Sequence, residues 1–156
     1  YSMMERMFEK DVIPLCKELN IGFVAFSPMA SGFLSGKYSK NTQYKGDDVR
    51  RVITRFAPEN VEKNQPLLDL LKEVSTQKNA TPAQISLAWM LHKYPHVVPI
   101  PGMRKDERVI ENLGASNIQL TEEEFIKFEK EDVDKNFSAN RIEIHPNNRM
   151  EECQSG

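Results

Sequence analysis

The feature that most constrains the fold of this chain lies between residues 97 and 112, where an apolar strand runs through Pro-Gly into a helix. Arg108, Glu111 and Asn112 lie three and four residues apart, so they share one face near the start of that helix. A helix N-terminus offers unpaired N–H groups and the positive end of the helix dipole, which suits a phosphate. The pattern predicts either a nucleotide site or an ordinary strand–helix unit with an Arg-Glu pair on its surface.

A second apolar strand, expected at residues 22–26, leads into a loop of small and polar residues. Ser-Pro, Ala-Ser-Gly and Ser-Gly-Lys in residues 27–37 let the backbone approach a ligand closely. Lys37, at the end of this loop, can reach a pyrophosphate. Two strand-to-loop junctions of this kind in one chain favour the nucleotide interpretation.

Three motifs are similar to those of one known family. Residues 26–37 contain Phe-Ser-Pro-Met followed by Gly and Gly-Lys, residues 81–89 read Thr-Pro-Ala-Gln-Ile-Ser-Leu-Ala-Trp, and residues 99–115 contain Pro-Ile-Pro-Gly, Arg and Glu-Asn-Leu-Gly-Ala. They resemble the signatures Tyr/Trp-Ser-Pro-Leu…Gly…Gly-Lys, Thr-Pro-Ala-Gln-Leu-Ala-Leu-Ala-Trp and Ile-Pro-Gly…Arg…Glu-Asn-Leu-Gly-Ala. These are the signatures of the aldo-keto reductases, and the resemblance runs from Tyr1 to about Val133 in the correct order and spacing.

The resemblance implies an α/β fold, the C-terminal portion of a (β/α)8 TIM barrel. A complete barrel takes about 250 residues, whereas this chain has 156. Residues 1–135 are expected to supply strands 7 and 8 with flanking helices, and residues 136–156 a polar C-terminal tail. The family's catalytic Asp, Tyr, Lys and His lie on earlier strands and have no counterpart here. We therefore expect a truncated chain without catalytic residues, whose partner is the missing N-terminal half of the barrel.

The resemblance also implies an NADP site at the ends of the two strands, where such barrels place their active sites and often a phosphate site. Phe26 takes the position of an aromatic ring that stacks on the nicotinamide, and Lys37 would balance phosphate charge. Gly102 permits close approach of the backbone. The expected cofactor-binding residues are Phe26, Ser27, Pro28, Met29, Ala30, Gly32, Lys37, Gly102, Arg104, Arg108, Glu111 and Asn112.

The adenosine end of the cofactor is assigned to the residues that follow Gly102. Arg104 is placed to pair with the ribose 2′-phosphate, because its guanidinium is always charged and binds bidentately. Arg108 would add charge or stack on adenine, while Glu111 and Asn112 would hydrogen-bond its amino group and ring nitrogens. Met103 departs from the family pattern, since many relatives carry Ser or Thr there, and Arg104 is expected to compensate for the lost hydroxyl.

The activity that the resemblance implies is NADP-dependent reduction of an aldehyde or ketone to an alcohol, by an oxidoreductase acting on CH-OH groups. Two alternatives remain open: a non-catalytic NADP-binding redox sensor similar to potassium-channel β subunits, and a stand-alone fragment without activity. Carbonyl reduction needs a proton donor, and the four tyrosines are not expected beside a Lys and a His at a strand end. The chain alone is therefore expected to be inactive.

Composition argues against several other functions. The chain has 21 Lys and Arg against 23 Asp and Glu, a formal net charge of −2, which argues against nucleic-acid and anionic-membrane partners. No apolar run approaches the roughly 20 residues of a spanning helix. Cys16 and Cys153 lie in unlike settings, which favours reduced thiols and a cytoplasmic protein. His92, His96 and His145 are scattered, so no metal site is expected.

The apolar spacing predicts helices around the two strands. Residues 2–19 read as one helix, with Pro14 kinking it or displacing its start. Its expected inner face is Met4, Phe8, Val12, Leu15 and Leu19. Residues 35–58 read as a polar loop too charged to belong to the core, and residues 61–78 as a second helix.

Capping signals mark the later helices. Thr81 begins a capping box, with Pro82 at the first helical position and Trp89 expected in the core. A helix is expected over residues 106–113. Thr121 begins another capping box, which opens a last helix.

Overall fold

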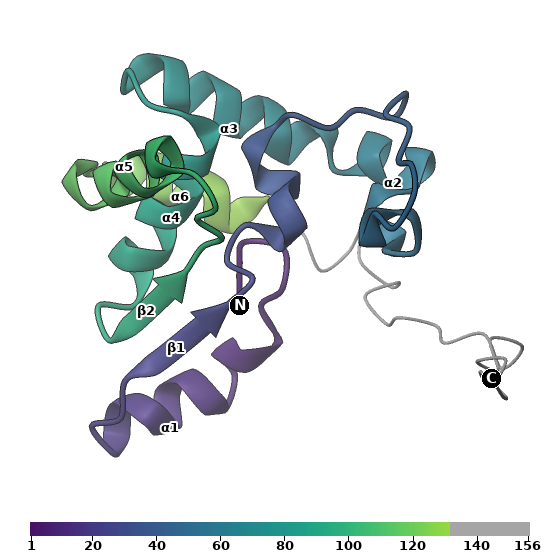
Figure 1. Ribbon diagram of the computed structural model, residues 1–156. Coiled ribbons are helices and arrows are strands. Elements are labelled where there is room, and N and C mark those ends of the chain that lie inside the picture. The colour runs from purple at the N-terminus through teal and green to yellow at the C-terminus, as the bar shows by residue number, and fades with distance from the viewer. Residues whose placement is uncertain (132–156) are drawn as a thin grey trace, which may run out of the picture.

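The computed structural model describes residues 1–131, which form a two-stranded parallel sheet with helices packed against it (Figure 1). β1 (Phe23–Phe26) pairs with β2 (Val97–Ile100) in a register that sets Phe26 opposite Ile100. The strand expected at residues 97–100 is confirmed, and the one expected at 22–26 begins one residue later. Because both strands end at the same edge, the loops that start at Ser27 and Pro101 begin side by side.

The two faces of this sheet differ in their environment. Ala25 and Val97 are buried among the core side chains, as is Trp89 of α4 (Pro82–Lys93). On the other face Val24, Phe26, Val98 and Ile100 are between 49% and 77% exposed. This alternation follows the two-residue period of a strand. It leaves an apolar sheet face without covering side chains from residues 1–131.

The helix predicted over residues 2–19 begins only at Val12, as the alternative that Pro14 displaces its start predicted, and its predicted inner face is wrong for three residues. Ser2 and Glu5 instead form an isolated antiparallel bridge, a 3₁₀ turn covers Met7–Glu9, and α1 spans only Val12–Glu18. Pro14 lies in the first turn of α1, where its missing N–H costs nothing. Ile13 is fully buried, and part of the predicted inner face is exposed: Val12, Leu15 and Leu19.

The single helix predicted over residues 61–78 is two helices, α2 (Pro58–Lys63) and α3 (Gln65–Gln77). Buried Asn64 separates them, and its side-chain amide donates to the carbonyl of Asn60 at 2.7 Å. Pro66 follows in the first turn of α3, where a proline starts a helix more readily than it continues one. The apolar side of α3 faces the core through Leu67, Leu71 and Val74.

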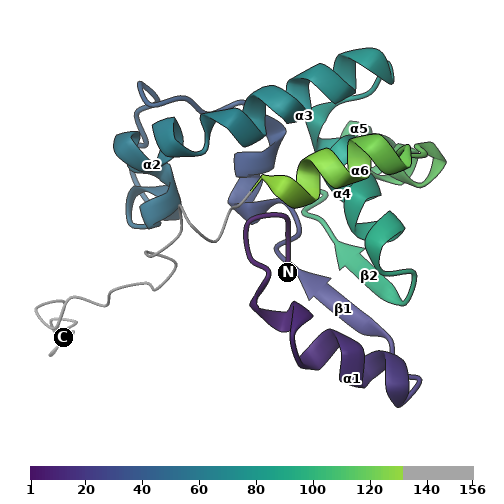
Figure 2. The ribbon, with the colours of Figure 1, turned by 180° about the vertical axis from the view of Figure 1, so that it is seen from behind.

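The remaining helices lie where the sequence predicted them. Thr81 and Thr121 each form a complete capping box, which opens α4 and α6 (Glu122–Lys130) respectively. α5 spans Asp106–Gly114, one residue longer than expected. Trp89 lies in the core as predicted. Figure 2 shows α4, α5 and α6 gathered next to α3, above the two strands in that view.

Residues 35–58, expected to lie outside the core, contribute to it in spite of their charge. Phe56 is buried, and its ring packs against those of Phe33, Tyr38 and Tyr44 at centroid distances of 5.5–5.6 Å. Arg50 lies over Tyr38 and donates to its hydroxyl. The expectation that this segment stays outside the core is therefore wrong for Phe56.

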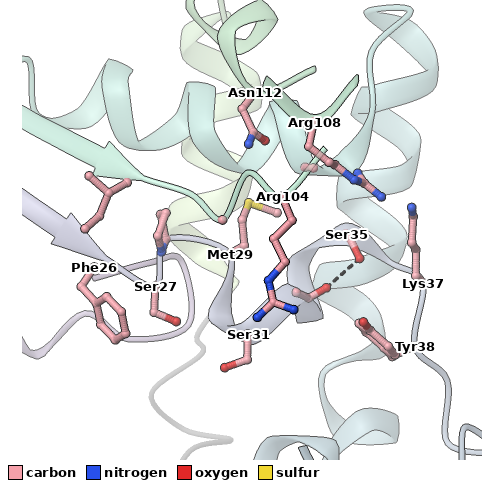
Figure 3. A pocket seen from close by; sticks show the side chains of 15 residues that line it. Phe26, Ser27, Met29, Ser31, Ser35, Lys37, Tyr38, Arg104, Arg108 and Asn112 are labelled. Carbon is pink, nitrogen blue, oxygen red and sulfur yellow. Dashed lines mark hydrogen bonds between the residues drawn. The ribbon is translucent and has the colours of Figure 1, made fainter. Parts of the chain in front are cut away.

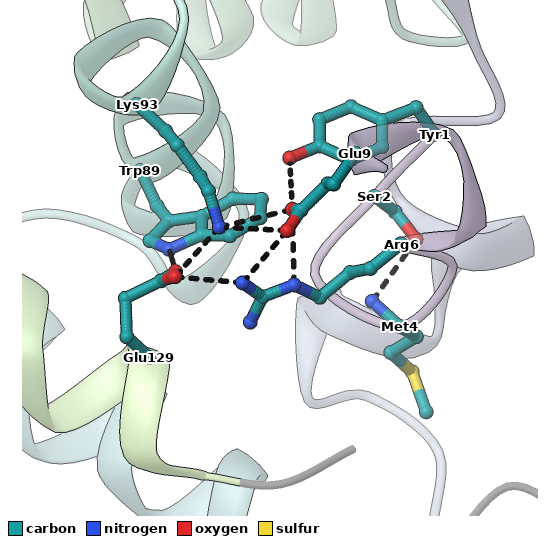
Figure 4. Close-up of polar contacts among 8 residues, drawn as sticks. All are labelled: Tyr1, Ser2, Met4, Arg6, Glu9, Trp89, Lys93 and Glu129. Carbon is teal, nitrogen blue, oxygen red and sulfur yellow. Dashed lines mark hydrogen bonds and ion pairs between the residues drawn. The ribbon is translucent and has the colours of Figure 1, made fainter. Parts of the chain in front are cut away.

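A cluster of charged residues, here called the charged network, joins the start of the chain to α4 and α6 (Figure 4). Arg6 and Lys93 each pair with both Glu9 and Glu129, with N–O distances of 2.6–3.0 Å. Glu129 also accepts from Nε1 of Trp89 at 3.0 Å, and both cations lie over the indole ring. The network fixes the end of α6 against the rest of the fold.

No helix within residues 1–131 is long and apolar enough to cross a membrane. The tail expected at residues 136–156, together with Cys153 and His145, lies outside the described residues. The boundary at residue 135 remains a prediction.

Candidate functional site

A cavity of about 600 Å³ opens at the carboxyl ends of β1 and β2, between the loops that follow them (Figure 3). Its volume lies within the range of about 300–1,000 Å³ that is usual for ligand and cofactor sites. Ten of the twelve residues proposed from the sequence line it: Phe26, Ser27, Pro28, Met29, Gly32, Lys37, Gly102, Arg104, Arg108 and Asn112.

The other two residues lie outside this lining. The side chain of Ala30 is buried, with 1% exposed. Glu111 lines an adjoining cavity of about 420 Å³, which shares Ser35, Lys37, Ala83 and Arg108 with the first. The two cavities form one continuous surface around Lys37 and Arg108.

The loop after β1 has an unusual backbone. Ser27, Ala30 and Ser31 are non-glycine residues with φ between +50° and +58°, and Gly32 follows with φ +90°. Each such non-glycine conformation costs on the order of 1 kcal/mol and persists only where the surrounding structure enforces it. Strain concentrated in one loop beside a cavity is typical of a ligand site.

Glycine is required at position 32 for a second reason. A Cβ there would lie 3.3 Å from Cε2 of Tyr38, which is tighter than an ordinary contact, in addition to the strained φ. Ser35 closes the same turn by donating its hydroxyl to the carbonyl of Gly32 at 2.6 Å. The loop is thus fixed from both sides before it reaches Lys37.

The lining of the larger cavity is positively charged. Lys37, Arg104 and Arg108 contribute to it and no carboxylate does. Arg108 pairs with Glu111, whereas within residues 1–131 no ion pair involves Lys37 or Arg104. Two unpaired cations beside a strained, small-residue loop favour a phosphate-bearing ligand.

Phe26 gives the opposite end of the cavity a flat apolar surface. Its ring is 77% exposed at the end of β1, although the residue is part of a strand. Within residues 1–131 no side chain covers this ring, which lines the cavity. Figure 3 shows the ring at one end of the cavity and Lys37 with Tyr38 at the other.

This geometry agrees with what comparison with known proteins finds. The model of the aldo/keto reductase family matches residues 1–132. The chain belongs to the aldo-keto reductase family. The motif-based assignment is confirmed.

Three solved structures illustrate the likeness. The chain is 27% identical to the thermostable aldo-keto reductase Tm1743, solved with the inhibitor epalrestat (TM-score 0.55, 82% of this chain and 36% of that one). It is 24% identical to a glycerol dehydrogenase from Gluconobacter oxydans, with a TM-score of 0.75, and the match covers 99% of this chain and 44% of that one. It is 22% identical to an aldo-keto reductase from Klebsiella pneumoniae in complex with NADPH, with a TM-score of 0.56, and the match covers 83% of this chain and 36% of that one.

The chain spans less than half the length of these structures, between 36% and 44%. Membership of the family implies the TIM-barrel fold, and residues 1–131 contain an α/β part of it with two neighbouring parallel strands. The position of the cavity fits this fold, because TIM barrels bind ligands at the carboxyl ends of their strands.

The structure adds five residues to the cavity lining that sequence reasoning did not select: Ser31, Ser35, Tyr38, Ala83 and Ile100. Ser31 and Ser35 belong to the small, polar loop already singled out, so that loop's composition was a usable signal. Tyr38 directly follows Lys37. Ala83 comes from the start of α4, and nothing in the local sequence indicates that this helix end faces the strand ends.

The four tyrosines of this aldo-keto reductase chain differ in their burial and in whether they line the larger cavity. Tyr1 is buried, and burial together with its hydrogen bond to Glu9 raises the pKa of its hydroxyl above the usual range. Burial also raises the pKa of Tyr44 and of Tyr94. Tyr38 alone among them lines the larger cavity, where its hydroxyl accepts from Arg50.

Metal ligands do not gather in the described part of the chain. Within residues 1–131 there is no group of three or more His, Cys, Asp or Glu side chains that could hold an ion. The chemistry available at the cavity is that of cations, hydroxyls, the Asn112 amide, backbone groups and the aromatic rings of Phe26 and Tyr38.

Proposed function

We propose that this chain is the cofactor-binding, C-terminal part of an NADP-dependent aldo-keto reductase that reduces aldehydes or ketones to alcohols. The observation that carries the proposal is the cavity at the ends of β1 and β2. It has an exposed aromatic ring at one end, and it contains two cations that have no ion pair within residues 1–131. A dinucleotide with one flat ring and several phosphates fits this distribution of apolar surface and charge.

Each part of the cavity takes a defined role in this proposal. Phe26 supports the nicotinamide ring, and the strained loop around Gly32 brings its backbone close to the cofactor. Lys37 balances the pyrophosphate, while Arg104 pairs with the 2′-phosphate. When bound, NADPH supplies the hydride, and the residues of this chain hold and orient it.

The adenine end is assigned to one face of α5. Arg108 and Glu111 pair with one another, and Asn112 lies one helical turn beyond Arg108 on the same face. Arg108 supplies charge or a stacking plane, and Glu111 and Asn112 supply hydrogen-bond partners for adenine. These groups stand on a regular helix, which holds them more firmly than a loop would.

The proton donor comes from residues outside this chain. Within residues 1–131, Tyr94 has both Lys93 and His96 beside its ring, but it precedes β2 and so lies at the edge of the sheet opposite the cavity. In this proposal β1 and β2 are strands 7 and 8 of the barrel, and the other strands cover the exposed sheet face that carries Val24 and Val98. Aldehydes and ketones reach the nicotinamide from that side.

The test compares two proteins: the 156-residue chain alone and the full-length natural protein that contains it. NADPH consumption is followed by absorbance with simple aldehydes and quinones as substrates. We expect turnover by the full-length natural protein and none by the chain alone. Turnover by the 156-residue chain would refute the placement of the proton donor, and NADPH binding without turnover by the full-length protein would favour a redox sensor.

A further inference from the structure

Gln84 ties together two helices that bound the candidate site, α4 and α5. Its side-chain oxygen accepts from the backbone N–H of Thr81 at 3.0 Å, which completes the capping box of α4. Its side-chain nitrogen donates to the carbonyl of Glu111 at 2.9 Å. One amide thus serves the first turn of α4 and the last turn of α5.

The carbonyl of Glu111 needs such a partner. It is one of the last four carbonyls of α5, which have no regular partner within the helix. The N–H of Ala115, which follows the helix, donates instead to the carbonyls of Asn112 and Leu113. Gln84 therefore provides from a neighbouring helix the cap that α5 lacks on its own.

The space around this contact is tightly filled. A Cβ added at Gly114 would lie 2.5 Å from the amide nitrogen of Gln84, a distance that requires the amide to move. The backbone of Gly114 is helical, with φ −58°, so alanine is acceptable there on conformational grounds. The absence of a side chain at Gly114 is thus needed for the position of Gln84 and not for the helix itself.

Both ends of the Gln84 bridge lie next to cavity walls. Ala83, the residue before Gln84, lines both cavities, and Thr81 lines the smaller one. On the other side, Glu111 holds Arg108, and Asn112 follows it in the chain. A shift of α5 along α4 therefore moves the polar face of α5 relative to Lys37 and the loop after β1.

We propose that Gln84 is a positioning residue for the adenosine end of the bound nucleotide. Its amide sets the place of α5, and hence of Arg108, Glu111 and Asn112, without touching the nucleotide. This role requires both a donor and an acceptor on one side chain, which an amide has and a carboxylate does not. The inference rests on the proposed function, because it concerns affinity for the same dinucleotide.

The test uses the full-length natural protein and two variants that change this contact in different ways. Gln84→Glu keeps the acceptor for Thr81 but loses the donor to Glu111. Gly114→Ala displaces the amide while improving the helix propensity of α5. We expect the Kd for NADPH, measured by fluorescence titration, to rise threefold to tenfold in both variants. We expect the KM for NADPH to rise similarly while kcat changes less than twofold.

The matched control is Glu124→Gln, which makes the reverse exchange at the equivalent position of the capping box of α6, away from the cavities. It also weakens the ion pair with Lys78, so it is expected to lower the melting temperature without changing the Kd. If Gln84 has a purely structural role, the Kd for NADPH rises in every variant whose melting temperature falls, including Glu124→Gln. A Gly114→Ala variant with a higher melting temperature and an unchanged Kd would refute the proposal.

The outcome also separates this inference from the proposed function. A parent protein that does not bind NADPH refutes the proposed function itself. If the parent binds NADPH and the Gln84→Glu and Gly114→Ala variants bind it with the same Kd, only the role of Gln84 is refuted. Amide hydrogen exchange at the end of α5 provides a readout that needs no cofactor, and Gln84→Glu is expected to accelerate it.

Discussion

Replacing Arg104 with alanine is expected to weaken binding of NADP selectively. Arg104 is exposed in the wall of the cavity and has no ion pair within residues 1–131, so its charge is available to a phosphate. A hydrogen bond to a charged group contributes about 1.5–3 kcal/mol. The exposure of Arg104 places the expected loss toward the lower end of this range, roughly a tenfold to thirtyfold rise in Kd.

The comparison cofactor is NAD, which lacks the 2′-phosphate. Its Kd is expected to change by less than about twofold in Arg104→Ala, because the group that Arg104 would pair with is missing. Arg108→Ala is the matched variant, since Arg108 lines the same cavity but already pairs with Glu111. We expect its effect to be smaller and shared equally by NADP and NAD.

The assay is isothermal titration of the full-length natural protein and both variants with each cofactor at one salt concentration, because screening weakens exposed ionic contacts. Arg104→Lys keeps the charge but loses the planar fork, and is expected to lie between the parent and Arg104→Ala. Equal losses for NADP and NAD in Arg104→Ala would refute the assignment of Arg104 to the 2′-phosphate.

Three further outcomes are expected. Burial alone would raise the pKa of Glu9, but hydrogen bonds from Arg6, Tyr1 and Lys93 outweigh it and hold this pKa below its usual value of 4.5. The resulting stabilisation is present above the pKa of Glu9 in the unfolded chain and is lost as pH falls through its lowered pKa in the folded protein. As pH falls below about 4.5, the urea concentration at the unfolding midpoint is therefore expected to decrease in the parent and to decrease less in Glu9→Gln. Phe26→Ala is expected to raise the Kd for NADPH about threefold to tenfold through lost stacking, with Phe26→Trp close to the parent; no change in either variant would contradict the nicotinamide contact. The 156-residue chain alone is expected to aggregate in sedimentation experiments because one sheet face is apolar and exposed, and a monomer that melts cooperatively would contradict this.

The sequence predicted those elements whose signals are local. The strand at Val97–Ile100 and the helices opened by Thr81 and Thr121 follow from apolar runs and capping boxes, which involve residues no more than a few positions apart. Pro14 correctly indicated a later start for α1, but the buried face of α1 and the break at Asn64 were missed. Both depend on which side chains the tertiary structure buries, and periodicity alone does not contain that information.

The candidate site was predictable to the extent that it lies on the two strand-end loops. The parallel register brings those loops together, so residues from both motifs meet in one cavity. Contributions from elsewhere were not predictable. Ala83 enters the cavity lining from the start of α4. Outside the site, the charged network joins Arg6 to Glu129 across 123 positions of sequence, and no local pattern indicates that contact either.

The most direct test of the account is a crystal structure of the full-length natural protein with NADP bound. We expect the nicotinamide ring to lie against Phe26, the pyrophosphate to lie beside Lys37, and the 2′-phosphate to pair with Arg104. A nucleotide bound at another place, or bound in the reverse direction with adenine against Phe26, would contradict it.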